Sequence, residues 1–188
     1  MKFDLYRHIK ELIENNEVLK KRYENLYQEL TFPAKTILLE AGKVSQNLYY
    51  IKQGCVRLWF NQDGKDITLQ FFFEGHSIAS IESFLRNTPS LFSIETIEPT
   101  TLWVYKKSDA VQLMADMPAL KDELHNLITE RLINYTHLFL SRIKDTPQQR
   151  YENLVKEYPE IIKRVPQHYI ASYLGITPVS LSRIRNRR

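Results

Sequence analysis

Seven side chains near the C-terminal end of the chain have the types that bind nucleic acid. They are all hydrogen-bond donors: Gln167, Thr177, Ser180, Ser182, Arg183, Arg185 and Arg187. Amide and hydroxyl groups donate to phosphate oxygens, and a guanidinium is the usual bidentate partner of guanine. Most of the seven would lie on or beside one short helix, so the set predicts contact with duplex DNA.

Two short helices that meet at Gly175 are predicted to carry these residues. Glycine ends the first helix because it adopts the left-handed conformation without a side-chain clash. Thr177 and Pro178 then restart the chain as a hydroxyl N-cap and a first-turn proline. The small Ala171 permits a close helix crossing, against which Leu181 packs. These features predict a helix-turn-helix; a helix hairpin with a solvated basic end is the alternative.

Charge is distributed unevenly along the 188 residues. From Ser141 to Arg188 there are ten Lys/Arg against four Asp/Glu, whereas the remainder holds sixteen against eighteen. A basic C-terminal end beside a slightly acidic body predicts one end that binds nucleic acid and one that does not.

The single cysteine and the N-terminal sequence indicate the cellular compartment of the protein. Cys55 alone cannot form an internal disulfide framework. The first residues carry charges throughout, and no apolar run is long enough to span a membrane. We therefore expect a cytoplasmic protein that has no membrane partner.

The N-terminal part, residues 1–107, is predicted to be a helix followed by a β-roll. Residues 3–27 have a helical apolar stripe, and from Thr31 the pattern changes to an alternation of period two. Asn61 to Gly64 is a turn signal between two alternating runs. The alternation stops between Ile78 and Pro89, which predicts a short inserted helix. Several short strands at even spacing favour an antiparallel roll.

Residues 108–144 are predicted to be helical, with Ser108 as N-cap and an interruption at Pro118. The long helix after the proline carries a seam of apolar residues spaced four, three and four apart, which is typical of a coiled coil. The seam consists of Ile128, Leu132, Tyr135 and Phe139. It predicts a dimer interface; a helix that packs only within its own chain is the alternative. Residues 145–188 form the third domain, which begins at a capping sequence, Asp145-Thr146-Pro147.

This order of elements resembles the cyclic-AMP receptor / fumarate-nitrate-reduction regulator family of bacterial transcription factors. The sharpest parts are IASYLGITPVSLSRIR near the end and FFFEGHSIASIESFLRNTPSLFSIETIEP in the roll. The resemblance implies an α+β fold. It comprises an antiparallel β-roll of the cyclic-nucleotide-binding jelly-roll type with flanking helices, a long dimerisation helix, and a winged-helix-like helix-turn-helix domain. The sequence departs from the family after the recognition helix, where we expect the hairpin wing of many members to be missing.

The resemblance also implies a function. The protein is expected to be a transcription regulator that binds double-stranded DNA as a homodimer, with RNA polymerase as a further candidate partner and an unidentified small-molecule effector. By position, the base-reading places fall on Pro178, Val179 and Arg183, and backbone-contacting places fall on Gln167 and Ser180. Members often carry glutamate where this chain has Val179, so we expect a different half-site, since valine cannot accept from cytosine.

The second segment resembles the effector-pocket cassette of the family. Members that bind a cyclic nucleotide use a Gly-Glu-Leu turn for the ribose and an Arg-Ser pair for the phosphate. Here the turn reads Ala79-Ser80-Ile81 and the pair falls on Leu91 and Phe92, which cannot neutralise a phosphate. No cyclic-nucleotide response is therefore expected. The pocket, empty or holding an apolar molecule, would be lined by Phe71, Phe73, Ser80, Ile81, Phe84, Leu91 and Phe92.

Catalytic residues, metal ligands and cofactors are not predicted. Of five histidines only His76 lies in the roll, whereas a cupin-type metal enzyme needs several that converge. There is no phosphate-binding or dinucleotide glycine motif. The competing reading is a sensor roll whose basic helical tail binds a protein or RNA. The sequence leaves open the effector, the operator, and whether the protein activates or represses.

Overall fold

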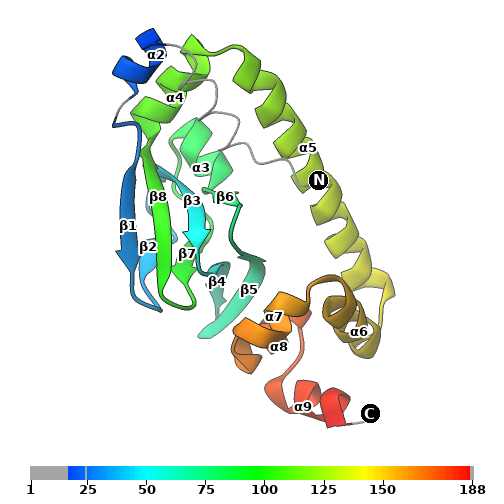
Figure 1. Cartoon of the computed structure of the whole chain (residues 1–188). Helices are drawn as coiled ribbons and strands as arrows, with labels where there is room; N and C mark the ends of the chain where they lie inside the picture. Colours follow the sequence, from blue (N-terminus) through cyan, green and yellow to red (C-terminus); the bar gives the residue numbers. More distant parts are fainter. Residues whose placement is uncertain (1–16, 24, 187–188) are drawn as a thin grey trace. The chain divides into compact units, whose positions relative to one another are not determined.

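The computed structural model describes residues 17–23 and 25–186, apart from the side chains of residues 119–123. The predicted N-terminal helix lies largely outside this part. Within it, α2 (Glu17–Arg22) is helical but ends before the predicted limit. The chain divides into two compact units, drawn in Figure 1. One contains residues up to 56 and 72–127, and the other contains residues 57–71 and 128–188. The second unit thus groups a segment expected within the roll with the C-terminal helices.

The strands form an antiparallel β-roll, as predicted for this α+β fold. One four-stranded sheet has the order β1-β8-β3-β6, whose strands span Gln28–Phe32, Thr100–Lys106, Asn47–Gln53 and Ser77–Ile78. A second sheet contains β2 (Ile37–Leu39), β7 (Ser93–Thr96), β4 (Val56–Gln62) and β5 (Lys65–Phe72). The predicted turn lies between β4 and β5, where Asp63 and Gly64 both have positive φ, as a two-residue hairpin requires.

The core of the roll is apolar and lies between the sheets. Ile51 is opposite Leu102 in the β3–β8 ladder, and both side chains are fully buried. All four residues of β7 are buried, so this strand does not show the polar-out alternation expected of a half-exposed sheet. A second cluster brings Tyr50 and Tyr105 against Leu113, from the helix that follows the roll.

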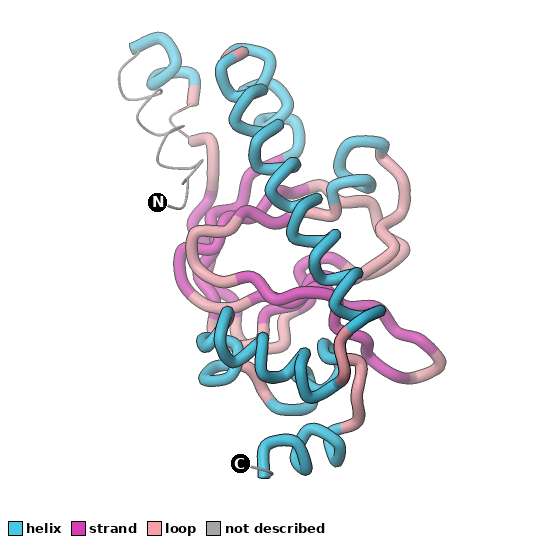
Figure 2. Tube along the Cα trace, turned by 90° about the vertical axis from the view of Figure 1, so that its right-hand side faces the viewer, coloured by secondary structure: helices cyan, strands magenta, loops and turns pink. Residues whose placement is uncertain are grey.

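That helix, α4 (Lys107–Asp116), begins earlier than predicted. Its N-cap is Lys106, and Ser108 lies in the first turn, where its hydroxyl donates to the carboxylate of Asp109 at 3.0 Å. The predicted Ser108 cap is therefore wrong. The reason is that β8 runs directly into the helix, so the cap falls on the last residue of the strand. Pro118 then separates α4 from α5 (Ala119–Lys144), which is one continuous helix, as predicted (Figure 2).

Four shorter helices follow α5. They are α6 (Pro147–Glu157), α7 (Pro159–Arg164), α8 (Gln167–Leu174) and α9 (Pro178–Asn186). Thr146 caps α6 as predicted, in a reciprocal capping box with Gln149 and with Pro147 in the first turn. Helix α7 was not predicted as a separate element. It begins at Pro159, because proline favours the first helical position and cannot continue α6.

Candidate DNA-binding interface and effector site

The corner between α8 and α9 has the geometry of the predicted helix-turn-helix. Gly175 is left-handed, with φ 68° and ψ 35°, and ends α8. Ala171 on α8 and Leu181 on α9 are both buried, as a close helix crossing requires. The outer side of α9 is consequently left for solvent or a ligand.

The hydroxyl groups of Thr177 and Ser180 form the N-cap of α9. The Ser180 N–H donates to Thr177 Oγ1 at 3.1 Å, and the two hydroxyl oxygens lie 3.0 Å apart. Each hydroxyl has one proton, and one of the two protons forms the hydrogen bond between the hydroxyls. One hydroxyl proton of this pair is therefore available to an outside acceptor such as a phosphate oxygen.

One face of α9 is exposed and has the spacing of a reading surface. It carries Val179, Ser182, Arg183 and Asn186, which are three, one and three residues apart and all exposed. Asn186 was not singled out in the sequence, although asparagine is the usual bidentate partner of adenine and its spacing from Arg183 would have indicated it.

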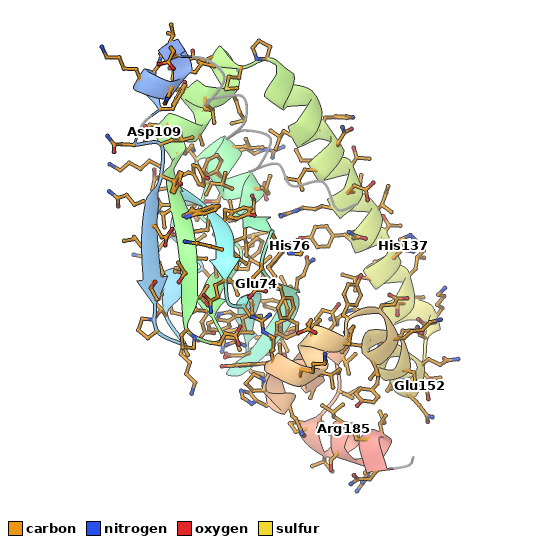
Figure 3. The ribbon with its side chains drawn as sticks, viewed as in Figure 1. Glu74, His76, Asp109, His137, Glu152 and Arg185 are labelled. Carbon is orange, nitrogen blue, oxygen red and sulfur yellow. The ribbon has the colours of Figure 1, made fainter. Side chains whose placement is uncertain are left out.

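The remaining predicted DNA-binding residues lie around this face. Pro178 and Gln167 are exposed at the first positions of α9 and α8, and Arg185 lies at the surface of α9 (Figure 3). Arg187 lies outside the described residues. Contact between these residues and DNA stays a prediction.

The predicted seam on α5 is exposed along its length in the isolated chain. Leu132 and Phe139 each have 65% of their surface exposed, and Ile128 and Tyr135 have 43%. Ile143, which the sequence analysis did not include, is 68% exposed and lies four residues beyond Phe139. The next step of the four-three repeat falls on Arg142, so the spacing alone does not indicate Ile143. Side chains of this size rarely stay in water on a helix unless another surface covers them.

The cassette in the roll is held by buried serine hydroxyls. Helix α3 (Ile81–Arg86) begins after Ser80, whose Oγ lies 2.9 Å from the hydroxyl of Ser90. The Ser45 N–H donates to Ser83 Oγ at 2.8 Å. All four serines are buried, and their hydrogen-bond partners are uncharged. The Ser80 and Ser90 hydroxyls therefore bond to each other, and Ser83 Oγ accepts from the backbone inside the roll.

The other predicted pocket residues differ in exposure and do not all belong to one compact unit. Phe84 on α3 is buried, whereas Ile81 is partly exposed and Leu91 is 77% exposed. Phe73 and Phe92 are half-buried. Phe71 belongs to the second unit, where its ring lies 5.3 Å from that of Tyr173 on α8. Whether any of these residues contacts an effector stays a prediction.

The described residues contain no group of three or more His, Cys, Asp or Glu side chains that could hold a metal ion. Among the helices that the structure describes, none is long and apolar enough to cross a membrane.

Comparison with known families identifies the roll. Residues 29–117 match the family model of the cyclic nucleotide-binding domain. The matched residues include all the strands described above except Gln28, the first residue of β1, together with α3 and α4. Among curated proteins, none matches the sequence.

Solved structures show the same fold over nearly the whole chain. A transcriptional regulator of the CRP/FNR family from Eubacterium rectale has 19% identity and a TM-score of 0.72, covering 98% of this chain and 86% of that one. A CooA variant from Carboxydothermus hydrogenoformans has 18% identity and a TM-score of 0.72, over 100% and 84%.

The cyclic-di-GMP-responsive regulator CLP from Xanthomonas campestris has 17% identity and a TM-score of 0.71, over 89% and 88%. The predicted resemblance to the cyclic-AMP receptor / fumarate-nitrate-reduction regulator family is thereby confirmed in the fold.

Proposed function

We propose that this protein is a sequence-specific DNA-binding transcription regulator that acts as a homodimer. The observation that carries the proposal is the second helix of the helix-turn-helix. It buries Leu181 and exposes Val179, Ser182 and Arg183 on one face. Such a helix can enter the major groove with its N-terminal residues at the base edges. The fold shared with regulators of this architecture supports the same role.

Selection of bound duplexes from a random pool tests the proposal directly. A regulator of this kind should enrich a two-fold-symmetric site whose half-sites are about one helical turn, roughly 10 base pairs, apart. Retention of RNA or of a protein instead of duplex DNA would favour the other reading of the basic C-terminal helices, in which they bind one of those partners.

Arg183→Ala is expected to lose discrimination at one base position of the selected site, by about 1–3 kcal/mol, because a guanidinium that binds one base edge contributes only there. Binding to every single-base variant of the site would be compared for the two proteins. Arg187→Ala is the matched control: in the basic tail, it should weaken all sites alike and reduce the salt slope by about one. If both substitutions weakened binding to all sites equally, α9 would not be the recognition helix.

We further propose that the roll has lost the phosphate site of cyclic-nucleotide-binding relatives. At the start of α3, Ser80 is already hydrogen-bonded to Ser90. Two cations have side-chain contacts with α3 or its C-cap, and both lie toward its other end: Arg86 is exposed and pairs with Glu82, and Lys107 donates to Asn87. A phosphate at the Ser80 end would be buried without a counter-charge, which costs several kcal/mol.

Isothermal titration with cyclic AMP, cyclic GMP and cyclic di-GMP is expected to show no binding tighter than about 100 μM, or roughly −5.5 kcal/mol. The third nucleotide is included because CLP responds to it. Near-ultraviolet circular dichroism of the same sample would show that the roll is folded. Tighter binding of any of the three would mean that the cassette supplies a phosphate partner.

A further inference from the structure

The first helix of the helix-turn-helix, α8, ends on carbonyl groups that its own backbone does not all satisfy. A helix leaves its last four C=O groups without partners inside the helix. Two of them, on Ala171 and Ser172, accept from backbone N–H groups of the following turn at 3.0 Å. The other two, on Tyr173 and Leu174, accept from arginine side chains of other helices.

Arg142 and Arg150 supply these donors. Arg142, on α5, donates to the carbonyl of Tyr173 at 2.5 Å, and Arg150 Nε, on α6, donates to that of Leu174 at 3.1 Å. A second nitrogen of Arg150 donates to the carbonyl of Asp145, in the link between α5 and α6, at 2.7 Å. The link between α5 and α6 is therefore bridged by hydrogen bonds from both flanking helices to the end of α8.

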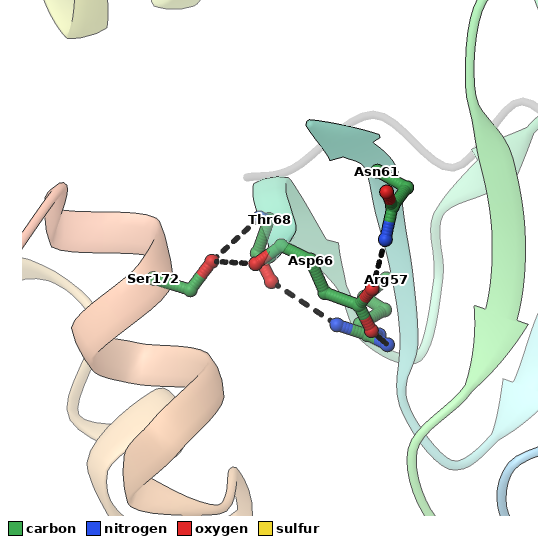
Figure 4. A network of polar contacts seen from close by, with 5 residues as sticks. All are labelled: Arg57, Asn61, Asp66, Thr68 and Ser172. Atoms are coloured by element: carbon green, nitrogen blue, oxygen red, sulfur yellow. Dashed lines mark hydrogen bonds and ion pairs between the residues drawn. The ribbon is translucent and has the colours of Figure 1, made fainter. Parts of the chain in front are cut away.

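The β4–β5 hairpin of the same unit holds α8 from its side (Figure 4). Ser172 Oγ donates to the carbonyl of Asp66 at 2.7 Å and accepts from the N–H of Thr68 at 2.8 Å. These are alternate residues of β5, an edge strand, whose outward backbone groups lack a neighbouring strand. The Ser172 hydroxyl of α8 thus bonds two backbone groups of β5 to which a neighbouring strand would otherwise bond.

Arg57, on β4, reinforces the same contact. Its side chain is 2% exposed, and its guanidinium carbon lies 3.8 Å from the ring centre of Tyr169 on α8 and 4.7 Å from that of Trp59. The guanidinium also pairs with the carboxylate of Asp66 at 3.2 Å. A buried charge is stable only when it is paired, and aromatic faces attract cations. Tyr169 and Ser172, three residues apart, are thus held by one hairpin.

We propose that Arg142 and Ser172 are positioning residues for DNA recognition. Both act through α8. Arg142 links α8 to α5, which carries the exposed seam, and Ser172 links α8 to the β4–β5 hairpin. Together they fix the angle between the helix-turn-helix and the dimer seam, all within one compact unit. In a dimer this angle sets the half-site spacing that the two α9 helices accept. The inference rests on the proposed function.

The test measures how strictly the dimer selects half-site spacing. One base pair inserted at the centre of the selected site moves one half-site by about 3.4 Å and turns it by about 35°. We define the spacing ratio as the affinity for the selected site divided by the affinity for the site with the inserted base pair. For the unchanged protein we expect a spacing ratio of about tenfold or more. For Arg142→Gln and for Ser172→Ala we expect a ratio of about threefold or less. A substitution that merely destabilised the fold would weaken both duplexes equally and leave the ratio unchanged.

Hydrogen exchange without DNA tests the contact itself. The Thr68 amide donates to Ser172, so it should exchange about tenfold faster in Ser172→Ala. Arg142→Lys, which keeps a charged donor, should recover part of the spacing ratio that Arg142→Gln loses. The matched control is Ser108→Ala, on α4. The Ser108 hydroxyl donates to Asp109 within its own turn, so this substitution should change neither measurement.

Each contrary result has its own meaning. If both variants keep the full spacing ratio, or if Thr68 exchange is unchanged in Ser172→Ala, the positioning role is refuted although the protein binds DNA. If the unchanged protein binds no duplex, the proposed function fails and the positioning role fails with it. A reduced ratio that Arg142→Lys partly restores supports the role.

Discussion

Glutamate at both Leu132 and Phe139 is expected to convert the protein to monomers and to abolish specific DNA binding. The two side chains lie seven residues apart on one face of α5, and each has 65% of its surface exposed in the single chain. Covering such a side chain stabilises an interface by about 1.5–3 kcal/mol. A dimer would cover four of them, and the double substitution replaces all four with charges of the same sign.

Light scattering at micromolar concentration would measure the change, from twice the chain mass to the 22.3 kDa of one chain. Specific binding should fall by about a hundredfold or more, because two linked half-sites then become two independent weak ones. Val111→Glu, at an exposed apolar position on α4, is the control and should remain dimeric. A wild-type protein that is monomeric both alone and on DNA would contradict the predicted interface on α5 and the predicted homodimer.

Gly54→Ala is expected to give the largest loss of stability among the glycine substitutions, at least about 3 kcal/mol in the free energy of unfolding. A Cβ placed on Gly54 would lie 2.5 Å from Thr100 Oγ1 and 2.8 Å from its Cα, and the backbone has φ +111°. Two costs therefore add: an unfavourable backbone conformation, and a clash with backbone that cannot move aside as a flexible side chain would.

Gly75→Ala separates these costs. Gly75 also has positive φ, +82°, but a Cβ there would meet nothing within 4 Å. It should lose only about 1–2 kcal/mol, the cost of the left-handed backbone. Urea unfolding of the three proteins gives the comparison. Equal losses for both variants would show that the roll relaxes around Thr100.

Local sequence signals predicted much of the C-terminal part, because each feature depends on neighbouring residues. Gly175 ends one helix, Thr177 caps the next, and Thr146 with Gln149 caps α6, all within four residues of the element they define. The α5 seam was likewise visible as a spacing. The Ser108 cap failed because the local signal was overridden by a strand that continues directly into the helix.

Contacts between distant parts of the sequence could not be predicted. Arg57 occupies an alternating strand position where a charge usually faces water, yet it is buried by an aspartate and two aromatic rings. The need for glycine at position 54 is not visible in the sequence, since its close approach to Thr100 depends on sheet packing. Nothing near Ser80 in the sequence indicates that its hydroxyl meets Ser90.

The bond between Ser172 and β5 joins residues 106 positions apart. During synthesis β5 therefore leaves the ribosome long before its partner exists, by roughly 5–20 s at about 5–20 residues per second. Over that interval the outward backbone groups of Asp66 and Thr68 form an open edge that another nascent chain could pair with. Lys65 and Asp66 place exposed charges at this edge, where charged side chains oppose such pairing until α8 has been made.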